Sequence, residues 1–477
     1  MAALVAVGLV VFGGLSGAGQ ASAEGTRYYE EDIRVGDSSR RVQVVEVDLD
    51  YPGLELDVAM SHDRLGGAES LQAIVEREGA LAAINANFFH AYSHLDPIGT
   101  LAKDGEIFLL EGGQVNAGIT GDNRILFNEA STLVEGRAED PGTTTGDNWR
   151  TWYVNTLNPN EHAMALYTPR RGDEVEIAVE GGAVIVDQDV VQGFVDTPAT
   201  VQIPPRGLVI FCGAKVVRDY RDFLHSRFVP GREVSFDYQL SGEEAGEAGF
   251  WDRVEHLVTA GPRLIREGQL DRESLNEYEE KISTQRGQRS ALGVTGDDKM
   301  LLVTVSSVTV SELGEIMASL GARDAMNLDG GASSALYYQG EIKTSPGREL
   351  STLLVVKERE IPAVQVEIDG ELLPLDVAPV IREGRVMVPM RSIFEALGAE
   401  IEWDAANQRV SGQRASTHVS LTIGEPRAEL NGAPVQLDVP AEISAGRTLV
   451  PTRFVAESLG ARVKWDAAQR LVQVVTQ

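Results

Sequence analysis

The sequence is poor in cysteine and in positive charge. Its single cysteine, Cys212, allows no disulfide within the chain, and its apolar surroundings, GLVIFCGAKVV, predict a buried side chain rather than a nucleophile. Only 42 lysines and arginines stand against 72 aspartates and glutamates, which gives a formal net charge of −30. Such a charge repels nucleic acid and anionic lipid, so neither is expected as a partner.

Several catalytic motifs are absent as well. The chain has no G-x-S-x-G, no P-loop and no G-x-G-x-x-G that follows a strand. Serine hydrolase, nucleotide hydrolase and dehydrogenase functions therefore lose support.

Long apolar runs are missing beyond the first residues. Residues 1–25 read MAALVAVGLVVFGGLSGAGQASAEG, a short apolar stretch followed by small residues. This pattern predicts an export signal, residues 1–23, cleaved before Glu24, although the usual basic start is lacking. No later run is long enough to span a bilayer. We therefore expect a bacterial protein that is secreted or associated with the cell envelope.

The C-terminal part contains a repeat. Residues 384–410, GRVMVPMRSIFEALGAEIEWDAANQRV, match residues 446–472, GRTLVPTRFVAESLGARVKWDAAQRLV. Each copy predicts a strand that ends at a proline, a short helix that ends at a glycine, and two further strands. The repeats are expected to span about 367–428 and 429–477 of a small α+β domain, 361–477.

Trp403 and Trp465 stand at the same place in the two repeats. We expect both in the core, with stacking on sugars as the alternative. The repeats hold one histidine, His418, and no cysteine, so no metal site is predicted there.

The larger part of the chain, residues 24–360, predicts an α+β domain with mixed strands and few helices. Strand-like runs such as RRVQVVEVDL and KMLLVTVSSV dominate it. ESLQAIVEREGA predicts a helix that ends at a glycine. TVSELGEIMASLGA predicts another, with Ser311 as its N-cap and its end at Gly321. The charged segment 355–366, VVKEREIPAVQV, is the expected junction with the repeats.

One candidate site is the stretch MNLDGGASSALYY, residues 326–338. A short strand followed by D-G-G would place Asp329 at a strand end. Gly330 and Gly331 leave room for a ligand to approach the backbone, and Ser333 and Ser334 offer hydroxyls beside it. The alternative is an ordinary solvated turn.

A second candidate is AAINANFFHAYSH, residues 82–94. The amides of Asn85 and Asn87 could bind sugar hydroxyls while Phe88 packs on the ring. The alternatives are an asparagine that caps a turn and a phenylalanine in the core.

Five further side chains leave their roles open. His90, His94 and Asp96 could bind a metal if they lay on a helix, but H-E-x-x-H is absent and the flanking residues favour a loop. Arg289, at the start of a strand, could hold an anion or form a surface ion pair. Arg348 presents the same choice.

Seven segments occur in an order that resembles the phosphodiester glycosidase family, over about residues 40–356: INANFF, PIGTLAKDGEI, NAGIT, VTAGPRLIREG, RSALGVTGDD, MNLDGGASSALYYQG and RELSTLLVV. The resemblance implies active-site roles for Asn85, Arg289, Asn327, Asp329, Gly330, Gly331, Ser333 and Arg348. Asn87 and Phe88 match a less strict part of the pattern, and Ala332 replaces a third glycine. The repeats resemble the copper amine oxidase N-terminal domain over about 367–477, here interpreted as a stalk or adhesion module without copper.

The resemblance implies hydrolysis of a sugar, N-acetylglucosamine above all, from a sugar-1-phosphodiester in envelope or exopolysaccharide glycans. Asp329 would be the nucleophile or base, Asn85 and Asn327 would hold sugar hydroxyls, and the arginines would hold phosphate. No cofactor is expected, and a role for a divalent cation stays open. The alternatives are a glycosidase of neutral polysaccharide and a non-catalytic glycan-binding surface protein, with the repeats contacting cell-wall glycans in either case.

Overall fold

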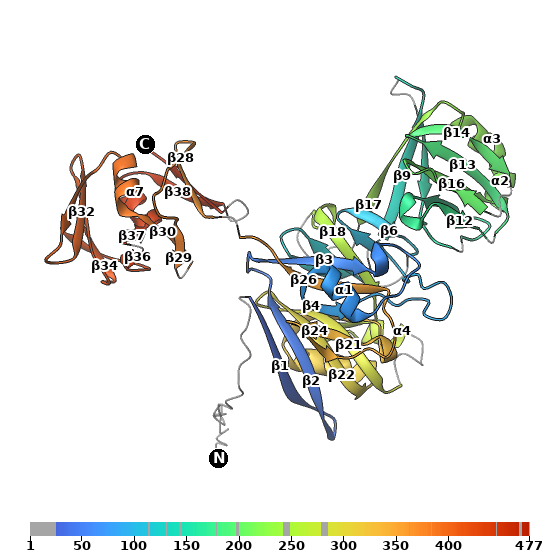
Figure 1. Cartoon of the computed structure of the whole chain (residues 1–477), viewed down its shortest axis with the longest axis horizontal. Helices are drawn as coiled ribbons and strands as arrows, with labels where there is room; N and C mark the ends of the chain where they lie inside the picture. Colours follow the sequence, from blue (N-terminus) through green and yellow to red (C-terminus); the bar gives the residue numbers. More distant parts are fainter. Residues whose placement is uncertain are drawn as a thin grey trace, which may run out of the picture. The chain divides into compact units, whose positions relative to one another are not determined.

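Two compact units make up the chain, Met1–Arg359 and Glu360–Gln477 (Figure 1). The computed structural model describes residues 25–476 except 113–114, 130, 143–145, 158, 178, 197–199, 242–248, 278–284, 362, 383, 445 and 467–469. The expected export signal, 1–23, lies outside the described residues. The boundary between the units falls in the charged segment 355–366.

The first unit is mostly β-structure, with three sheets around one core. Sheet A runs β1 (Thr26–Val35), β2 (Ser38–Asp48), β22 (Lys299–Val308), β21 (Gly287–Thr295), β23 (Ala322–Asn327), β19 (Arg263–Arg266) and β20 (Gln269–Leu270). Sheet B runs β25 (Glu341–Thr344), β24 (Leu336–Tyr338), β4 (Ala80–Asn85), β26 (Thr352–Glu358) and β3 (Leu54–Met60). Sheet C runs β6 (Glu106–Leu109), β5 (Leu101–Lys103), β18 (Val254–Ala260), β7 (Val115–Thr120) and β8 (Ile125–Asn128).

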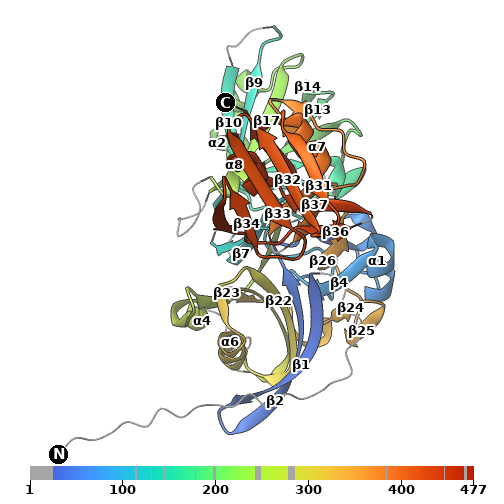
Figure 2. The same cartoon turned by 90° about the vertical axis from the view of Figure 1, so that its left-hand side faces the viewer.

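Successive side chains of a strand point to opposite faces of its sheet, and this alternation explains how each of the three sheets turns one apolar face toward the shared core. In β3, for example, Leu54, Leu56, Val58 and Met60 all point into the shared core. Ala59 points the other way and packs under helix α1 (Leu71–Glu78). Helix α6 (Val310–Ser319) likewise covers the outer face of sheet A (Figure 2). The core sheets are therefore apolar on both faces.

A fourth sheet, sheet D, is inserted between β8 and β18. It runs β10 (Gly146–Thr151), β9 (Ser131–Glu139), β17 (Glu233–Ser241), β14 (Val190–Asp196), β13 (Gly181–Asp187), β16 (Gly207–Gly213) and β11 (Met164–Tyr167). The strand pair β12 (Glu174–Glu176) and β15 (Thr200–Gln202) and the helices α2 (Ala214–Asp219) and α3 (Arg221–Arg227) accompany it. Cys212 lies in β16 with none of its surface exposed, and burial raises the pKa of its thiol to about 12. It is therefore the inert core residue that its apolar surroundings predict.

Two helices test the capping predictions. Helix α1 ends at Gly79 in the left-handed conformation, φ 62°, as ESLQAIVEREGA predicts. The predicted N-cap of α6, Ser311, is wrong. The cap is Thr309, whose hydroxyl accepts from Glu312 N while the Glu312 carboxylate accepts from Thr309 N. Starting the helix at Val310 buries that side chain, which a later start would leave outside the helix. A further helix, α4 (Arg272–Glu277), packs near β19.

The second unit contains three small sheets. The first sheet runs β28 (Glu371–Leu372), β27 (Gln365–Ile368), β39 (Leu471–Val475) and β38 (Arg462–Asp466). The second runs β29 (Val380–Arg382), β30 (Arg385–Pro389), β37 (Arg447–Pro451) and β36 (Glu442–Ser444). The third runs β31 (Glu400–Asp404), β32 (Arg409–Arg414), β33 (Thr417–Thr422), β34 (Arg427–Leu430) and β35 (Ala433–Gln436). Helices α7 (Met390–Ala396) and α8 (Thr452–Ser458) follow Pro389 and Pro451, as predicted.

Corresponding strands of the two repeats pair with each other. In the antiparallel pair β30–β37, Val388 lies opposite Val450, its counterpart in the second repeat. Trp465 is half-buried against the core, but Trp403 is 43% exposed, so the prediction of a core position is wrong for Trp403. Its strand, β31, carries mostly exposed residues, which leaves the ring little to pack against.

No helix in the described part of the chain is both long and apolar enough to cross a membrane.

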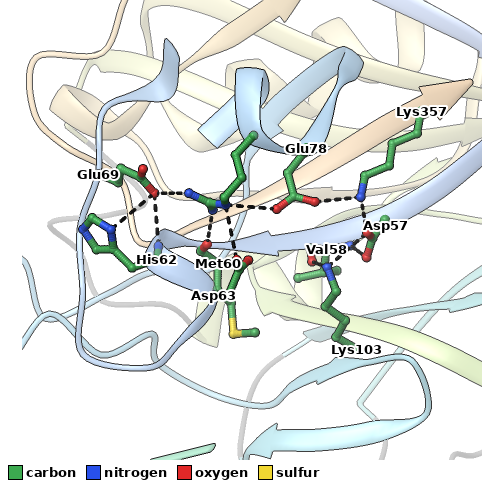
Figure 3. Close-up of polar contacts among 10 residues, drawn as sticks. Asp57, Val58, Met60, His62, Asp63, Glu69, Glu78, Lys103 and Lys357 are labelled. Carbon is green, nitrogen blue, oxygen red and sulfur yellow. Dashed lines mark hydrogen bonds and ion pairs between the residues drawn. The ribbon is translucent and has the colours of Figure 1, made fainter. Parts of the chain in front are cut away.

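A charge network joins β3, α1 and β26 (Figure 3). Asp57 accepts hydrogen bonds from Lys103 Nζ at 3.1 Å and from Lys357 Nζ at 2.6 Å, and Lys357 also donates to Glu78. The network continues through Arg77, which pairs with both Glu78 and Glu69. Burial acts to raise the pKa of Asp57, but its hydrogen bonds with the two lysines outweigh burial and hold the pKa below its usual value.

We predict that Asp57→Ala destabilises the first unit by about 3 kcal/mol, because it leaves two mostly buried ammonium groups without their shared carboxylate. Differential scanning calorimetry of the full chain would show a lower melting temperature for the first unit. The matched control is Asp50→Ala, since Asp50 is exposed and lies 3.5 Å from Arg124. Equal shifts for the two variants would contradict the prediction.

Candidate active site

Asp329 lies where the ends of sheets A and B meet. β23 ends at Asn327, two residues earlier, so the carboxylate stands at a strand end as the sequence predicts. Its own amide donates to Ala86 O, just beyond β4, at 3.1 Å. The preceding amide, of Leu328, donates to Ser290 O in β21 at 2.9 Å. Backbone hydrogen bonds to both sheets therefore hold this loop.

Asn85, the last residue of β4, connects the same three segments through its side chain. Its Nδ2 donates to the main-chain oxygen of Asp329 at 2.6 Å. Its Oδ1 accepts from Ser290 Oγ at 2.7 Å and from Ala335 N at 2.9 Å. Asn85 is 2% exposed, so the contacts that the structure records for this amide are internal rather than with solvent. Ser290 was not singled out in the sequence, because a serine inside an apolar strand gives no local signal of this role.

The Asp329 side chain is packed within the protein on most sides yet keeps part of its surface open to solvent. Burial raises its pKa to about 6, against the opposing effects of a hydrogen bond with Ser333, the Gly330 amide at 2.9 Å, and the charges of Arg348 and Arg289. A carboxyl group poised near neutral pH can serve as a base or a nucleophile.

Arg289 approaches the loop closely. Its Nη2 donates to Gln285 O at 2.6 Å, and burial lowers its pKa while the charge of Asp329 raises it. A Cβ added to Gly330 would lie 3.3 Å from Arg289 Nη1 and 3.2 Å from Gln288 O. A larger residue at 330 would therefore crowd these two groups, and glycine avoids this. Gly331 needs glycine for a different reason, because its φ is 64°.

Arg348 lies on the other side of the loop. Its guanidinium stacks over the ring of Tyr92 at 5.0 Å and donates to the Tyr92 hydroxyl at 2.8 Å. Tyr92 is 92% exposed, and neither its contact nor its position could be read from the loop sequence.

A pocket of about 370 Å³ lies beside these residues. Its lining comes from the residue Ala68 before α1, from the loop after β4, from the Asp329 loop and from the segment before β26. The lining residues are Ala68, Phe89, Ala91, Tyr92, Leu95, Ala332, Gly347, Arg348 and Glu349. Gly347 N donates to Ala332 O at 2.8 Å, which joins the last two segments. Ala332 belongs to the same loop as Asp329, and Arg348, whose charge acts on Asp329, also lines the pocket.

The remaining candidate residues lie in the frame of the site. Asn327 donates through Nδ2 to Gly261 O at 2.7 Å, and Asn87 donates through Nδ2 to Ile98 O and Thr100 O. Phe88 packs against the shared core, and Ser334 has none of its surface exposed. The two asparagine amides thus tie neighbouring segments of main chain together, while Phe88 and Ser334 contribute to the packing.

Among the described residues, His90 and His94 belong to no group of three metal-type ligands. His90 and His94 lie in a loop with their rings 4.3 Å apart, and Asp96 contacts both His94, at 3.0 Å, and Arg171, at 2.8 Å. A separate group, Asp57, Asp104 and His256, brings three metal-type ligands together elsewhere in the unit. The two lysines that already bind Asp57 do not fit a cation there.

The raised pKa of Asp329 predicts a stability effect that depends on pH. Between the usual aspartate value of 3.8 and about 6, the folded state holds this proton more tightly than the unfolded state, so stability falls as pH rises through that window. Above pH 6, the free energy of unfolding is lower by up to about 3 kcal/mol for this reason. We therefore predict that Asp329→Asn melts at a higher temperature than the parent at pH 8 and at a similar temperature near pH 4. A variant that is less stable at pH 8 would contradict this.

Comparison with known proteins gives two family matches. Residues 173–362 match the model of a family described as phosphodiester glycosidase, a stretch that contains Arg289, Asn327, Asp329 and Arg348. Residues 367–474 match the copper amine oxidase N-terminal domain. No curated protein matches the chain.

Similar structures agree at the level of the fold. A hypothetical protein from Synechocystis aligns over 70% of this chain with a TM-score of 0.61 and 20% identity, and the chain spans 62% of that protein. A protein from Burkholderia pseudomallei aligns over 67% of this chain and 74% of its own length, with a TM-score of 0.54 and 21% identity.

The catalytic domain of zebrafish N-acetylglucosamine-1-phosphodiester alpha-N-acetylglucosaminidase aligns over 70% of this chain and 83% of its own length, at 13% identity. Its TM-score of 0.38 is too low to establish a shared fold. Both resemblances read from the sequence are nevertheless confirmed by the family matches: the chain carries a phosphodiester glycosidase segment at 173–362, followed by a copper amine oxidase N-terminal domain at 367–474.

Proposed function

We propose that this protein is an exported hydrolase that releases a sugar, N-acetylglucosamine above all, from a sugar-1-phosphodiester. The observation that carries the proposal is the setting of Asp329, a carboxyl group with a pKa of about 6 that feels the charges of two arginines beside a pocket. The family match over the same residues supports the reaction class.

The reaction suits a site with one such carboxylate. Hydrolysis at C1 breaks the bond between the sugar and the phosphate oxygen and expels a phosphomonoester, which is already a good leaving group. Most glycosidases use a second carboxylic acid to protonate the leaving oxygen, and here that help is less necessary. Above pH 6 Asp329 is mainly ionised, so it can attack C1 or take a proton from the attacking water.

The arginines supply the charge that the substrate requires. Arg289 and Arg348 each present a planar guanidinium that can hold two phosphate oxygens. Arg348 also lines the pocket, where Tyr92 holds it through a neutral hydroxyl rather than a carboxylate. A phosphodiester can therefore bind without first displacing an acidic partner from Arg348.

The asparagines take a different part in the proposal from the one the resemblance implied. Asn85 is a positioning residue, because its amide holds the main chain of Asp329. Asn327 positions the same loop from the other side, through Gly261. The sugar would then be held by groups that face the pocket.

The setting that we propose is the bacterial envelope. The signal-like segment 1–23 would direct export, the catalytic domain would span 24–360, and the C-terminal domain would act as a stalk that contacts surface glycans. The substrate would be a glycan or polymer that carries sugar-1-phosphodiesters. The strong negative charge keeps such a protein soluble.

We predict that the full chain releases free sugar from a synthetic N-acetylglucosamine-1-phospho-methyl diester or from UDP-N-acetylglucosamine. Asp329→Asn should lower this rate by about a thousandfold or more, as expected for loss of a catalytic carboxylate. Asp297→Asn, on an exposed turn, is the matched control. In the parent, kcat/KM should rise through about pH 6, the pKa of Asp329.

Each other outcome of this assay has a definite meaning. An active, folded Asp329→Asn protein would refute the catalytic assignment. No release from a panel of sugar-1-phosphodiesters would favour a non-catalytic glycan-binding protein. Loss of activity with a chelator would show that a divalent cation takes part.

We predict that Arg289→Lys weakens the binding of phosphodiester substrates by about tenfold or more, since lysine loses the bidentate contact with phosphate. The binding of a neutral aryl glycoside should change little. KM and kcat for both substrates would be measured side by side. Arg286→Lys is the control, because that exposed arginine pairs with Glu312. An equal loss on both substrates would argue against a phosphate role for Arg289.

A further inference from the structure

The second unit contains a pocket of about 440 Å³ that is lined mostly by its second repeat and, within residues 381–386, by its first. Its lining comes from β38 and β39, from the end of β37 and α8, from the β29–β30 hairpin, and from the end of β35 with the two residues that follow. The lining residues are Ile381, Gly384, Arg385, Val386, Gln436, Leu437, Asp438, Pro451, Thr452, Arg453, Phe454, Glu457, Val463, Trp465 and Val472. The volume lies within the range of small-ligand sites, about 300–1,000 Å³.

Two aromatic rings form the apolar surface of this pocket. Trp465 stands opposite Val472 on the β38–β39 pair, and Phe454 comes from α8. Both side chains are half-buried and pack against the core of the unit on one side. Their other side faces the pocket, so the core holds the rings in place while leaving them available to a ligand.

The rim of the pocket is polar but carries no net charge. Arg385 Nε lies 2.7 Å from Asp438 Oδ2, and Arg453 Nε lies 3.9 Å from Glu457 Oε1. The two positive groups are therefore matched by two negative groups, in a chain whose formal charge is −30. Paired planar groups of this kind can donate to and accept from hydroxyls, and they do not select for a charged ligand.

The first repeat lacks half of this arrangement. The position that corresponds to Phe454 is Ser392, whereas the tryptophan, arginine and glutamate are kept as Trp403, Arg391 and Glu395. Trp403 lies 43% exposed in β31. The helix of the first repeat carries its phenylalanine two positions later, at Phe394, which is fully buried and aligns with Ala456. The second repeat is therefore the one whose helix phenylalanine lines this pocket.

We propose that this pocket binds a neutral saccharide, with one sugar ring stacked on Trp465 and Phe454 and its hydroxyls bonded to the paired rim residues. Rigid aromatic faces match the apolar faces of pyranose rings, and balanced planar polar groups match their hydroxyls. The pocket would attach the protein to a glycan through its second repeat. This inference does not require the first unit to be a hydrolase.

The test measures binding of tri-N-acetylglucosamine and of cellotriose to the full chain. Binding would be measured by isothermal titration calorimetry and tryptophan fluorescence. Every protein in this series would also carry Asp329→Asn, so that no sugar is hydrolysed during the measurement. Phe454→Ser should weaken binding by about tenfold, and Trp465→Ala should weaken it further, as expected for truncation of anchor residues in a binding site. Trp403→Ala, the matched tryptophan of the first repeat, should leave the affinity unchanged.

The Phe454→Ser variant keeps the test decisive if Trp465→Ala fails to fold, because serine already occupies the equivalent position 392. Binding that survives Phe454→Ser, or that Trp403→Ala weakens equally, would overturn the proposal. So would the absence of binding to both oligosaccharides.

Self-association in sedimentation experiments that Phe454→Ser abolishes would instead assign the pocket to a second copy of the chain. Sugar-release assays on Phe454→Ser with Asp329 intact should show unchanged turnover, which separates this proposal from the catalytic one.

Discussion

The candidate site depends on the hydrogen bonds of one buried amide. Asn85 donates to the main chain of Asp329 and accepts from Ser290 and from Ala335, so it ties together the end of β4, strand β21 and the loop after β23. A buried amide that lost these partners would be costly, which makes the arrangement strongly preferred. The position of the carboxylate is therefore set by the junction of two sheets rather than by its own loop.

This junction also explains the electrostatics of Asp329. The loop presses the carboxyl group into protein, and burial raises its pKa to about 6. Ser333, the Gly330 amide and two arginines limit that rise without removing it. The first unit thus carries an unfavourable group at neutral pH, which its extensive apolar core and the Asp57 network can offset. Stability given up at a site in this way is common where chemistry requires a shifted pKa.

The second unit shows what duplication followed by divergence can produce. Pairing of β30 with β37 places equivalent residues of the two repeats opposite each other. The two helices differ at several positions, among them Ser392 and Phe454, and Phe394 and Ala456. The first repeat therefore has its helix phenylalanine fully buried at 394, whereas the second has Phe454 beside Trp465 in the lining of a pocket.

The sequence by itself determined the local features. The repeats, the glycine that ends α1, the burial of Cys212 and the strand end at Asp329 all follow from patterns within a few residues, because capping and alternation are local. It also yielded the family resemblance through the order of its motifs. The Thr309 cap of α6 was also within reach of the sequence, because T-V-S-E at 309–312 is a capping-box pattern. Only the tertiary structure decided that Asn85 contacts the main chain of Asp329 and that Ser290 and Tyr92 belong to the site. These contacts join residues up to 256 positions apart, and no local pattern specifies which of many polar side chains will meet.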